Sequence, residues 1–443
     1  MSDETQTQPL SPAGTGPASA SPSARAPISS STNAPASADA PVPRVPAWSA
    51  RLLVVGLVLA ALNLRPAITS LGALLEEVRD GLHMSGSVAG VLASVPPFCF
   101  AGFGFAAPRL ARRFGPKAVV LAGMVAITAG LLVRPLMSGT AGFLAASALA
   151  LMGIAVSNVL MPVIVKRYFP DRVGTMTGLY SMALAAGTAV AAAVTVPMTR
   201  ALGGSWRTGL GVWALLAALA VLPWLGLLRD RDTTAPSPRA SQRVPPGLSL
   251  GRSRTAWALA CFFGLQATGA YIAMSWMPQI FRDAGVSAGT AGLLLAVTMV
   301  MGVPLAFVIP RTAARMKHQG PIALALGVCG LTAFAGLYLA PAEGAWAWAV
   351  LLGISNCSFP LALTMIGMRS RTGAGVVRLS AFAQSTGYLI SIPGPLLVGV
   401  LYQHTGGWGL PIALMAGFLV PQMAAGVIAG RDRTIEDEAR MGD

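Results

Sequence analysis

One arginine lies inside an apolar stretch near the start of the chain. Arg65 stands in Asn63-Leu-Arg-Pro66, within an apolar run that begins near residue 50. A charged side chain at mid-bilayer costs about 3 kcal/mol on insertion scales, so it normally faces a polar cavity or a partner. The sequence places no Asp or Glu deep in an apolar run, and the forked donors of arginine suit planar oxyanions. We therefore predict that Arg65 binds a small anion; the alternative is an arginine that bonds helix carbonyls or snorkels outward.

The residues after Arg65 support a bent helix beside a cavity. Pro66 has no amide donor and leaves the carbonyl of Leu62 free, so the helix can bend there. We expect the helix to run on to about Arg79. Thr69 and Gly72 then share the Arg65 face, which would put a hydroxyl and an open patch beside the cation. Alternatively, the Thr69 hydroxyl bonds its own helix backbone.

Other polar side chains inside apolar runs are further candidates for contacting a solute. They are amides and one phenol in the fourth, seventh, tenth and eleventh runs: Asn158, Gln266, Tyr271, Asn356 and Gln384. Uncharged amides at matching depths could bind a small polar solute from two sides, or they could form hydrogen bonds between helices. Trp276, by contrast, is expected in the aromatic belt at the outer interface.

The composition is that of a protein embedded in a lipid bilayer. Of its 443 residues, 54% are hydrophobic and 11% are charged, and the mean hydropathy is +0.66. A soluble domain has about a quarter of its residues charged. Runs long enough to span a bilayer number twelve and lie near 50–75, 86–108, 117–135, 139–165, 173–199, 206–228, 255–281, 288–310, 321–340, 344–367, 377–402 and 408–430.

The basic residues alternate between the loops in the way that sets membrane topology. With the N-terminal tail placed inside, the inside segments hold 25 Lys and Arg residues and the outside loops hold 5. This bias predicts a cytoplasmic location for both termini, in the inner cell membrane. The net charge of +15 is therefore a topology signal, and we do not expect nucleic-acid binding.

The two halves of the chain resemble each other. Asn158-x-x-x-Pro162 recurs as Asn356-x-x-x-Pro360, and Gly204-Ser-Trp206 recurs as Gly406-Gly-Trp408. Repeats of this kind are typical of transporters built around a shared cavity. We predict an all-α membrane protein with a disordered cytoplasmic tail (1–48), a six-helix bundle (49–229), a cytoplasmic linker (230–254), a second six-helix bundle (255–430) and a short cytoplasmic tail (431–443).

Basic loops follow the second and eighth runs at corresponding positions. They read Pro108-Arg-Leu-Ala-Arg-Arg-Phe-Gly-Pro-Lys117 and Pro310-Arg-Thr-Ala-Ala-Arg-Met-Lys317. We expect their cations to set topology and to cap the cytoplasmic helix ends, where charge contacts could hold one closed state. These cations are Arg109, Arg112, Arg113, Lys117, Arg311, Arg315 and Lys317.

Together these motifs resemble the major facilitator superfamily, and more narrowly its cyanate-permease and nitroimidazole-transport family. The resemblance covers roughly residues 50–430. It rests on Asn63-Leu-Arg-Pro66, Phe169-Pro-Asp-Arg-Val-Gly174 with Gly178-Leu-Tyr180, Gly264-Leu-Gln266, Trp276-x-Pro278 and Leu379-Ser-Ala-Phe-Ala-Gln-Ser-Thr-Gly-Tyr-Leu389. The acidic residue usual in the middle of the first basic loop is missing here. The resemblance implies a rocker-switch carrier of small anions or small polar organic molecules.

The expected function is therefore secondary active or facilitative transport of a small, cyanate-like anion or small polar solute by alternating access. The alternative is an exporter of neutral, drug-like heterocycles. A membrane enzyme or sensor is disfavoured, because no cluster of nucleophiles, carboxylates or metal ligands lies at membrane depth. We expect a monomer in the bilayer with a small-molecule solute as partner, no cofactor and no metal.

Overall fold

The structure is a computed structural model that describes residues 47–169, 172–229 and 250–441. Nearly all of the predicted N-terminal tail and most of the predicted linker lie outside these ranges. Within them the secondary structure is helical, with no strand. Twelve helices or helix pairs are long and apolar enough to cross a membrane, which confirms the expected all-α fold.

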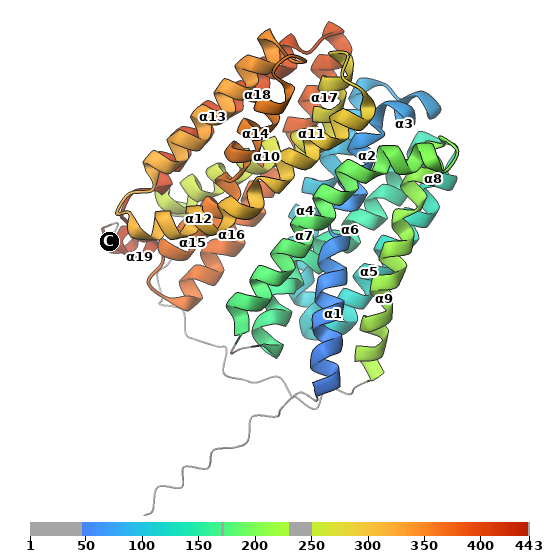
Figure 1. The fold of residues 1–443 in the computed structure, drawn as a ribbon. Coiled ribbons are helices and arrows are strands. Elements are labelled where there is room, and N and C mark those ends of the chain that lie inside the picture. The colour runs from blue at the N-terminus through green and yellow to red at the C-terminus, as the bar shows by residue number, and fades with distance from the viewer. Residues whose placement is uncertain (1–46, 170–171, 230–249, 442–443) are drawn as a thin grey trace, which may run out of the picture. The chain divides into compact units, whose positions relative to one another are not determined.

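The helices before the linker form the N-terminal bundle (Figure 1). They are α1 (Ala47–Asn63), α2 (Pro66–Ala73), α3 (Leu75–Gly81), α4 (Gly86–Phe114), α5 (Pro116–Val133), a 3-10 turn η1 (Arg134–Leu136), α6 (Thr140–Tyr168), α7 (Val173–Ala201), α8 (Trp206–Gly211) and α9 (Trp213–Arg229).

The helices after the linker form the C-terminal bundle. They are α10 (Arg254–Asp283), which a 3-10 turn (Leu250–Arg252) precedes, α11 (Ala288–Val300), α12 (Gly302–Arg315), α13 (Gly320–Leu339), α14 (Ala345–Asn356), α15 (Ser358–Met368), α16 (Gly373–Ser391), α17 (Pro393–Thr405), α18 (Gly409–Ala429) and α19 (Ile435–Met441).

We call the end of the bundles where α1 begins and α18 ends the tail face, and the opposite end the far face. The bundles approach each other at the far face and diverge towards the tail face (Figure 1). Small residues allow the approach. A Cβ placed on Gly72 of α2 would collide with the carbonyl oxygen of Met274 in α10, and one on Gly292 of α11 would lie 2.5 Å from that of Ala192 in α7. The backbones of the two bundles are therefore in direct contact there.

Polar contacts join the bundles at the same end. Arg282, in the last turn of α10, forms salt bridges of 2.8 and 2.9 Å with Glu76 and Glu77 of α3. The side-chain Oε1 of Gln403 in α17 accepts hydrogen bonds from the amide and the hydroxyl of Ser87 in α4. The far face is thus closed in this conformation.

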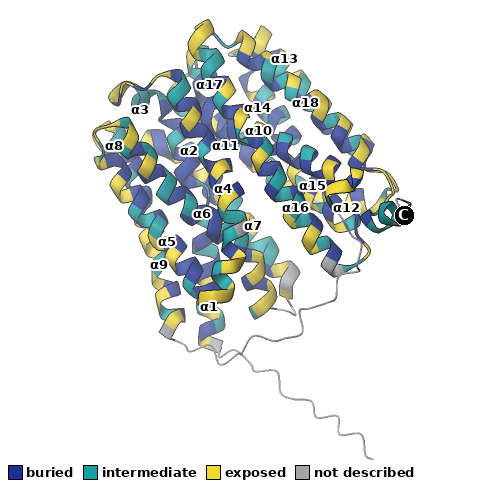
Figure 2. Cartoon of the chain, turned by 180° about the vertical axis from the view of Figure 1, so that it is seen from behind, coloured by how far each residue is buried: buried dark blue, intermediate teal, exposed yellow. Residues whose placement is uncertain are grey.

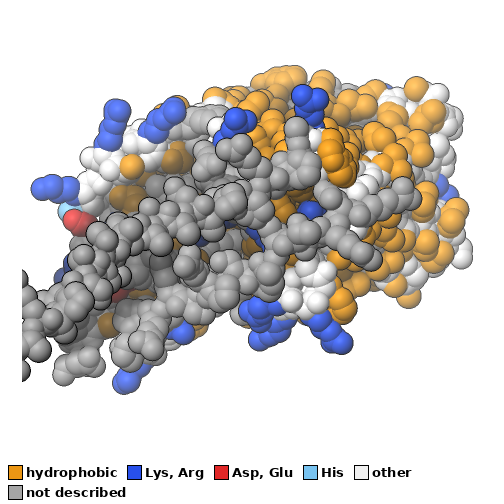
Figure 3. All heavy atoms as spheres, turned by 90° about the horizontal axis from the view of Figure 1, so that it is seen from below, with side chains coloured by type: hydrophobic (Ala, Val, Ile, Leu, Met, Phe, Trp, Pro, Cys, Tyr) orange, Lys and Arg blue, Asp and Glu red, His pale blue; other side chains and the backbone are white. Residues whose placement is uncertain are grey.

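The outer sides of the bundles are apolar. Large hydrophobic side chains stay exposed there, such as Leu215 (69%), Leu222 (61%) and Val420 (59%), while the inward sides of the helices are buried (Figure 2). Lys and Arg side chains lie around the edge of the tail face (Figure 3). This arrangement matches a protein whose sides contact lipid and whose ends contact water.

The predicted C-terminal tail is partly structured. Helix α19 packs under the C-terminal bundle, where Glu438 accepts hydrogen bonds from the hydroxyls of Ser253 and Thr255 at 2.6 and 2.7 Å. Glu436 accepts another from the hydroxyl of Ser370 at 2.6 Å. Since Ser253 is also the N-cap of α10, α19 ties together the tail-face ends of several helices.

Candidate solute-binding site

Arg65 occupies a break in the first span. Helix α1 ends at Asn63 and α2 begins at Pro66, and Arg65 is the N-cap residue of α2 with φ −124° and ψ −28°. Proline at the first helical position explains the break, because its ring and missing amide interrupt the preceding helix but suit a helix start. A second break follows at Leu74. The expectation of one helix continuing to Arg79 is therefore wrong, although helical segments do reach Gly81.

The guanidinium of Arg65 contacts a tyrosine of the other bundle. The Tyr271 hydroxyl, on α10, interacts with Arg65 and with the Tyr388 hydroxyl on α16. Arg65 is itself only half-buried. The cation of the N-terminal bundle and two phenols of the C-terminal bundle thus lie close together.

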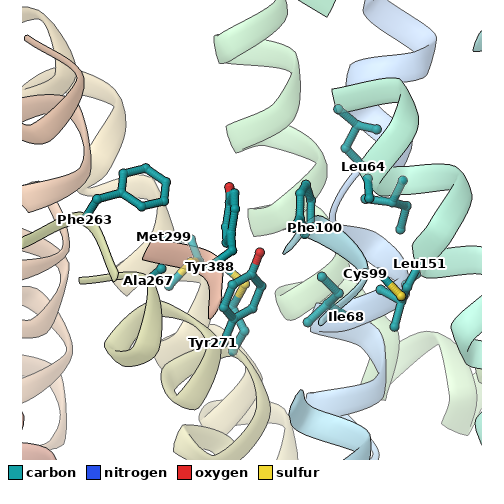
Figure 4. Close-up of a cluster of buried hydrophobic side chains, with 14 of the residues drawn as sticks. Leu64, Ile68, Cys99, Phe100, Leu151, Phe263, Ala267, Tyr271, Met299 and Tyr388 are labelled. Carbon is teal, nitrogen blue, oxygen red and sulfur yellow. The ribbon is translucent and has the colours of Figure 1, made fainter. Parts of the chain in front are cut away.

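Aromatic rings surround this polar group. Phe100 of α4 stacks on Tyr388 with ring centroids 5.0 Å apart and planes 24° apart, and Phe263 of α10 meets Tyr388 edge-on at 5.2 Å. In Figure 4, Tyr388 lies between Phe263 and Phe100, with Tyr271 next to it. We call Arg65, Phe100, Tyr271 and Tyr388 the central site.

Carboxylates are scarce near this cation. In the twelve candidate spans within the described residues, the acidic residue is Asp283, at the end of α10. Its carboxylate accepts hydrogen bonds from Tyr402 and Trp408 at the far face. The charge of Arg65 is therefore balanced by dipoles alone within the described part of the chain, which leaves it available to an anion.

Comparisons with known proteins show to which family the chain belongs. The sequence profile of the Major Facilitator Superfamily matches residues 53–377. The chain belongs to this superfamily. It is 31% identical to the 2-nitroimidazole transporter of Escherichia coli (strain K12) over 87% of this chain and 96% of that protein. It is 30% identical to the E. coli cyanate transport protein over 83% of this chain and 95% of that one.

A third relative and the solved structures agree with this assignment. An uncharacterized transporter of Bacillus subtilis (strain 168) is 36% identical over 86% of this chain and 94% of its own length. Among solved structures, the nucleoside transporter NupG has a TM-score of 0.68 at 14% identity, covering 86% of this chain and 98% of that one. The D-xylose-proton symporter has a TM-score of 0.66 at 16% identity, covering 87% and 98%. The protein is thus a multi-pass membrane transporter and not an enzyme.

Two predicted neighbours of Arg65 in this transporter have packing roles in the observed conformation. Thr69 is fully buried, and its hydroxyl donates to the Arg65 carbonyl oxygen at 3.2 Å. Gly72 does not provide the expected open patch, because α2 lies directly on the backbone of α10 there.

Gln266 and Asn356 come together, but away from Arg65. The Gln266 side-chain amide donates to Asn356 Oδ1 at 3.0 Å, while its own Oε1 has no hydrogen-bond partner. Both residues line a cavity of about 60 Å³ inside the C-terminal bundle, together with Ser355 and Gln422. Gln266 and Tyr271 thus point to different sides of α10.

The other two predicted amides, Asn158 and Gln384, are half-buried in the transporter. Asn158 lies in α6, a continuous helix, whereas its counterpart Asn356 ends α14 at a helix break. The Gln384 amide donates to the hydroxyl of Ser380, one turn earlier on α16, at 2.7 Å. Neither forms part of the central site as defined above.

The cations predicted to act in gating and topology lie at the tail face. All are exposed except Lys117, which is 7% exposed and whose ammonium lies 4.9 Å from the ring centroid of Tyr168.

Sequence reasoning missed or misplaced several residues. Tyr388 and Phe100 were not singled out, although Tyr388 lies in the same motif as Gln384. Trp276 is not a belt residue, since it is fully buried and its ring packs against Tyr402 and Trp408. Arg134, at the end of the apolar run 117–135, is 1% exposed. Such placements depend on which helices are neighbours, and one sequence does not give that.

Proposed function

We propose that this transporter carries a small monovalent anion, cyanate-like in size, between the two sides of the membrane by alternating access. The observation that carries the proposal is Arg65, a half-buried cation in a helix break that meets Tyr271 of the other bundle. The forked donors of arginine bind planar anions well. A hydroxyl from the opposite bundle would make the site complete only when the bundles come together around the solute.

The relatives support this range of solutes. One is named for transport of cyanate and another for transport of 2-nitroimidazole. Cyanate is a small linear anion, and 2-nitroimidazole is a small planar heterocycle with polar groups. The central site suits such molecules because a cation and hydroxyls lie beside flat aromatic rings.

The orientation in the membrane follows from the charge bias. We place the tail face in the cytoplasm, since the segments at that end hold 25 Lys and Arg residues against 5 at the other. The conformation described above is then inward-facing, with its outer gate closed by Arg282, Glu76 and Glu77. The halves 49–229 and 255–430 would rock about the central site as a monomer in the cytoplasmic membrane.

Electrical energy limits the direction of transport. Moving one negative charge into a cell costs about 2.3 kcal/mol per 100 mV of membrane potential. Export of an anion, or its exchange for another anion, therefore needs no further energy source. We favour these two modes over uptake of the anion alone.

The test is transport by purified protein in liposomes. Labelled cyanate flux is compared between the wild type, Arg65→Ala, Arg65→Lys and the control Arg433→Ala, which removes an exposed tail-face arginine. We expect Arg65→Ala to abolish flux, Arg65→Lys to retain part of it and the control to behave as the wild type. Unchanged flux in a folded Arg65→Ala protein would refute the proposal.

A second candidate is carriage of a neutral heterocycle. The stacked pair of Phe100 and Tyr388, with centroids 5.0 Å apart, favours it, because a planar ring could insert beside these rings. Charge movement separates the two candidates. A carried anion produces a current that reverses with the membrane potential, whereas a neutral heterocycle transported alone produces none.

A further inference from the structure

A second buried arginine lies in the N-terminal bundle, near the far face. Arg134 of η1 is 1% exposed, and its NH1 donates to the carbonyl oxygen of Ala67 in α2 at 3.0 Å. Its guanidinium also lies 5.7 Å from the ring centroid of Phe143. Its Nε and its second terminal nitrogen have no hydrogen-bond partner. Two strong donors of a buried cation are therefore unsatisfied, which is costly in a protein interior.

No opposite charge from the described residues compensates Arg134. The salt bridges at the far face join Arg282 to Glu76 and Glu77 instead. A buried cation with neither a paired charge nor enough hydrogen bonds is rarely stable. A partner from outside the chain would resolve this imbalance.

The structure contains a space for such a partner. Arg134 lines a cavity of about 20 Å³ between α2, α4, α6 and α10, together with Ser147 of α6 and Ser275 of α10. The Ser147 hydroxyl is also buried without a hydrogen-bond partner. The cavity is large enough to hold at least one small species.

The donors around this cavity select the sign of the charge. The guanidinium offers donors only, and a serine hydroxyl can turn to donate. A water would satisfy some of these donors but would leave the charge of Arg134 unbalanced. From the donors and the charge together, we infer that this cavity is a binding site for one small anion, chloride under cellular conditions.

This site is separate from the central site. Ile68 and Leu151 belong to the cavity wall, and in Figure 4 Ile68 lies between Tyr271 and Leu151. Among the described residues that line this cavity are neither Arg65 nor Tyr271. The inference does not depend on the nature of the transported solute.

The site also has a consequence for the conformation. Ser275 belongs to the C-terminal bundle, whereas the other residues of the wall belong to the N-terminal one. The cavity is complete only when α2 packs on α10, which is the state with the far face closed. A ligand stabilises the state that it binds best, so chloride should favour closure of the far face.

The first test measures halide binding in the intact protein in detergent. Thermal unfolding is followed while chloride replaces gluconate at constant ionic strength. We expect a saturable rise in Tm for the wild type, and at least a tenfold weaker chloride response in Arg134→Gln and in Ser147→Val. The control Arg65→Gln should keep the wild-type response, which separates this site from the proposed solute site.

The second test does not depend on a variant that folds. Wild-type crystals grown with bromide should give an anomalous scattering peak beside Arg134 and Ser147. A Tm that does not respond to chloride, or a cavity that holds only water in the presence of bromide, would overturn the inference.

Discussion

At the scale of single residues, the central site depends on contacts made between the bundles. Arg65 and Tyr271 lie on opposite sides of the interface between the bundles. The contact between these two side chains can therefore change as the bundles move. The side chains of Thr69 and Gln266 already form hydrogen bonds within their own bundles. We therefore assign solute contact to the first pair and structural roles to the second.

Tyr271→Phe should weaken solute binding without unfolding the protein. The change removes one hydroxyl and keeps the ring, and a neutral hydrogen bond contributes about 0.5–1.5 kcal/mol. We expect an apparent affinity about three- to tenfold lower, measured as KM in the liposome assay. An unchanged KM would mean that this hydroxyl does not reach the solute.

Gln266→Leu should act on stability instead. It leaves Asn356 Oδ1 without its donor inside the C-terminal bundle, at a cost of about 1–3 kcal/mol. We expect a lower Tm and a KM close to that of the wild type. A large rise in KM with an unchanged Tm would return this amide to the solute site.

The sequence predicted the chemistry of these residues better than it predicted which residues they contact. Arg65 was recognisable because a cation is rare in an apolar run, whereas Phe100 and Tyr388 look like ordinary apolar residues of a span. The amide pair was also recognisable from its depth. Its separation from Arg65 depends on the rotation of α10, and periodicity alone does not fix which side of a helix faces the other bundle.

At the scale of elements, the contact of α2 with α10 closes the far face. The backbones meet at Gly72, where any side chain would collide with Met274. A collision with a backbone carbonyl cannot be relieved by a rotamer change. The role of Gly72 is thus to permit closure.

Gly72→Val should trap the transporter with its far face open. The matched control is Gly417→Val on α18, where a Cβ would meet no atom within 4 Å. We expect the first variant to bind solute from the far side but to lose flux, and the control to transport normally. Flux at the wild-type level in Gly72→Val would contradict the account of this contact.

The acidic helix α19 is predicted to detach at low pH. The pKa of Glu438 is lowered, because hydrogen bonds from Ser253 and Thr255 to its carboxylate outweigh the opposing effect of burial. The pKa of Glu436 is lowered in the same way, with burial again opposed by the hydrogen bond from Ser370. Because docking lowers these pKa values, the ionised carboxylates stabilise docking at pH values above their ordinary pKa of 4.5. This stabilisation is lost as the pH falls through the lowered pKa.

Hydrogen exchange of α19 would measure this effect. We expect protection of its amides, corrected for the intrinsic rate, to be constant above the ordinary pKa and to fall at more acidic pH. Glu438→Gln should reduce protection at neutral pH as well. Protection that is independent of pH would mean that these carboxylates do not hold α19.

At the scale of the whole molecule, the architecture was predictable and the conformation was not. Span length, loop charge and the repeated Asn-x-x-x-Pro pattern each follow from local composition, and the twelve spans lie close to their predicted positions. Which face is open depends on contacts such as that of Arg282 with Glu76 and Glu77. These residues are far apart in the sequence and carry no local signal of their pairing.

Loss of the salt bridges of Arg282 with Glu76 and Glu77 should shift the equilibrium towards the state in which the far face is open. Arg282→Gln removes both salt bridges at the far face, while the backbone contact at Gly72 remains. With spin labels at Ser87→Cys and Gln403→Cys, we expect a larger fraction of long distances between α4 and α17 than in the labelled protein with Arg282 intact. Identical distance distributions would show that the salt bridges do not contribute to closure.

The central claim is that Arg65 binds the solute, and calorimetry tests it most directly. Cyanate is titrated into purified wild type, Arg65→Lys and Arg65→Ala, with Arg433→Ala as control. Since a hydrogen bond to a charged group contributes about 1.5–3 kcal/mol, we predict binding about ten- to a hundredfold weaker in Arg65→Ala and an intermediate loss in Arg65→Lys. Equal affinity of Arg65→Ala and the wild type for cyanate would contradict the account.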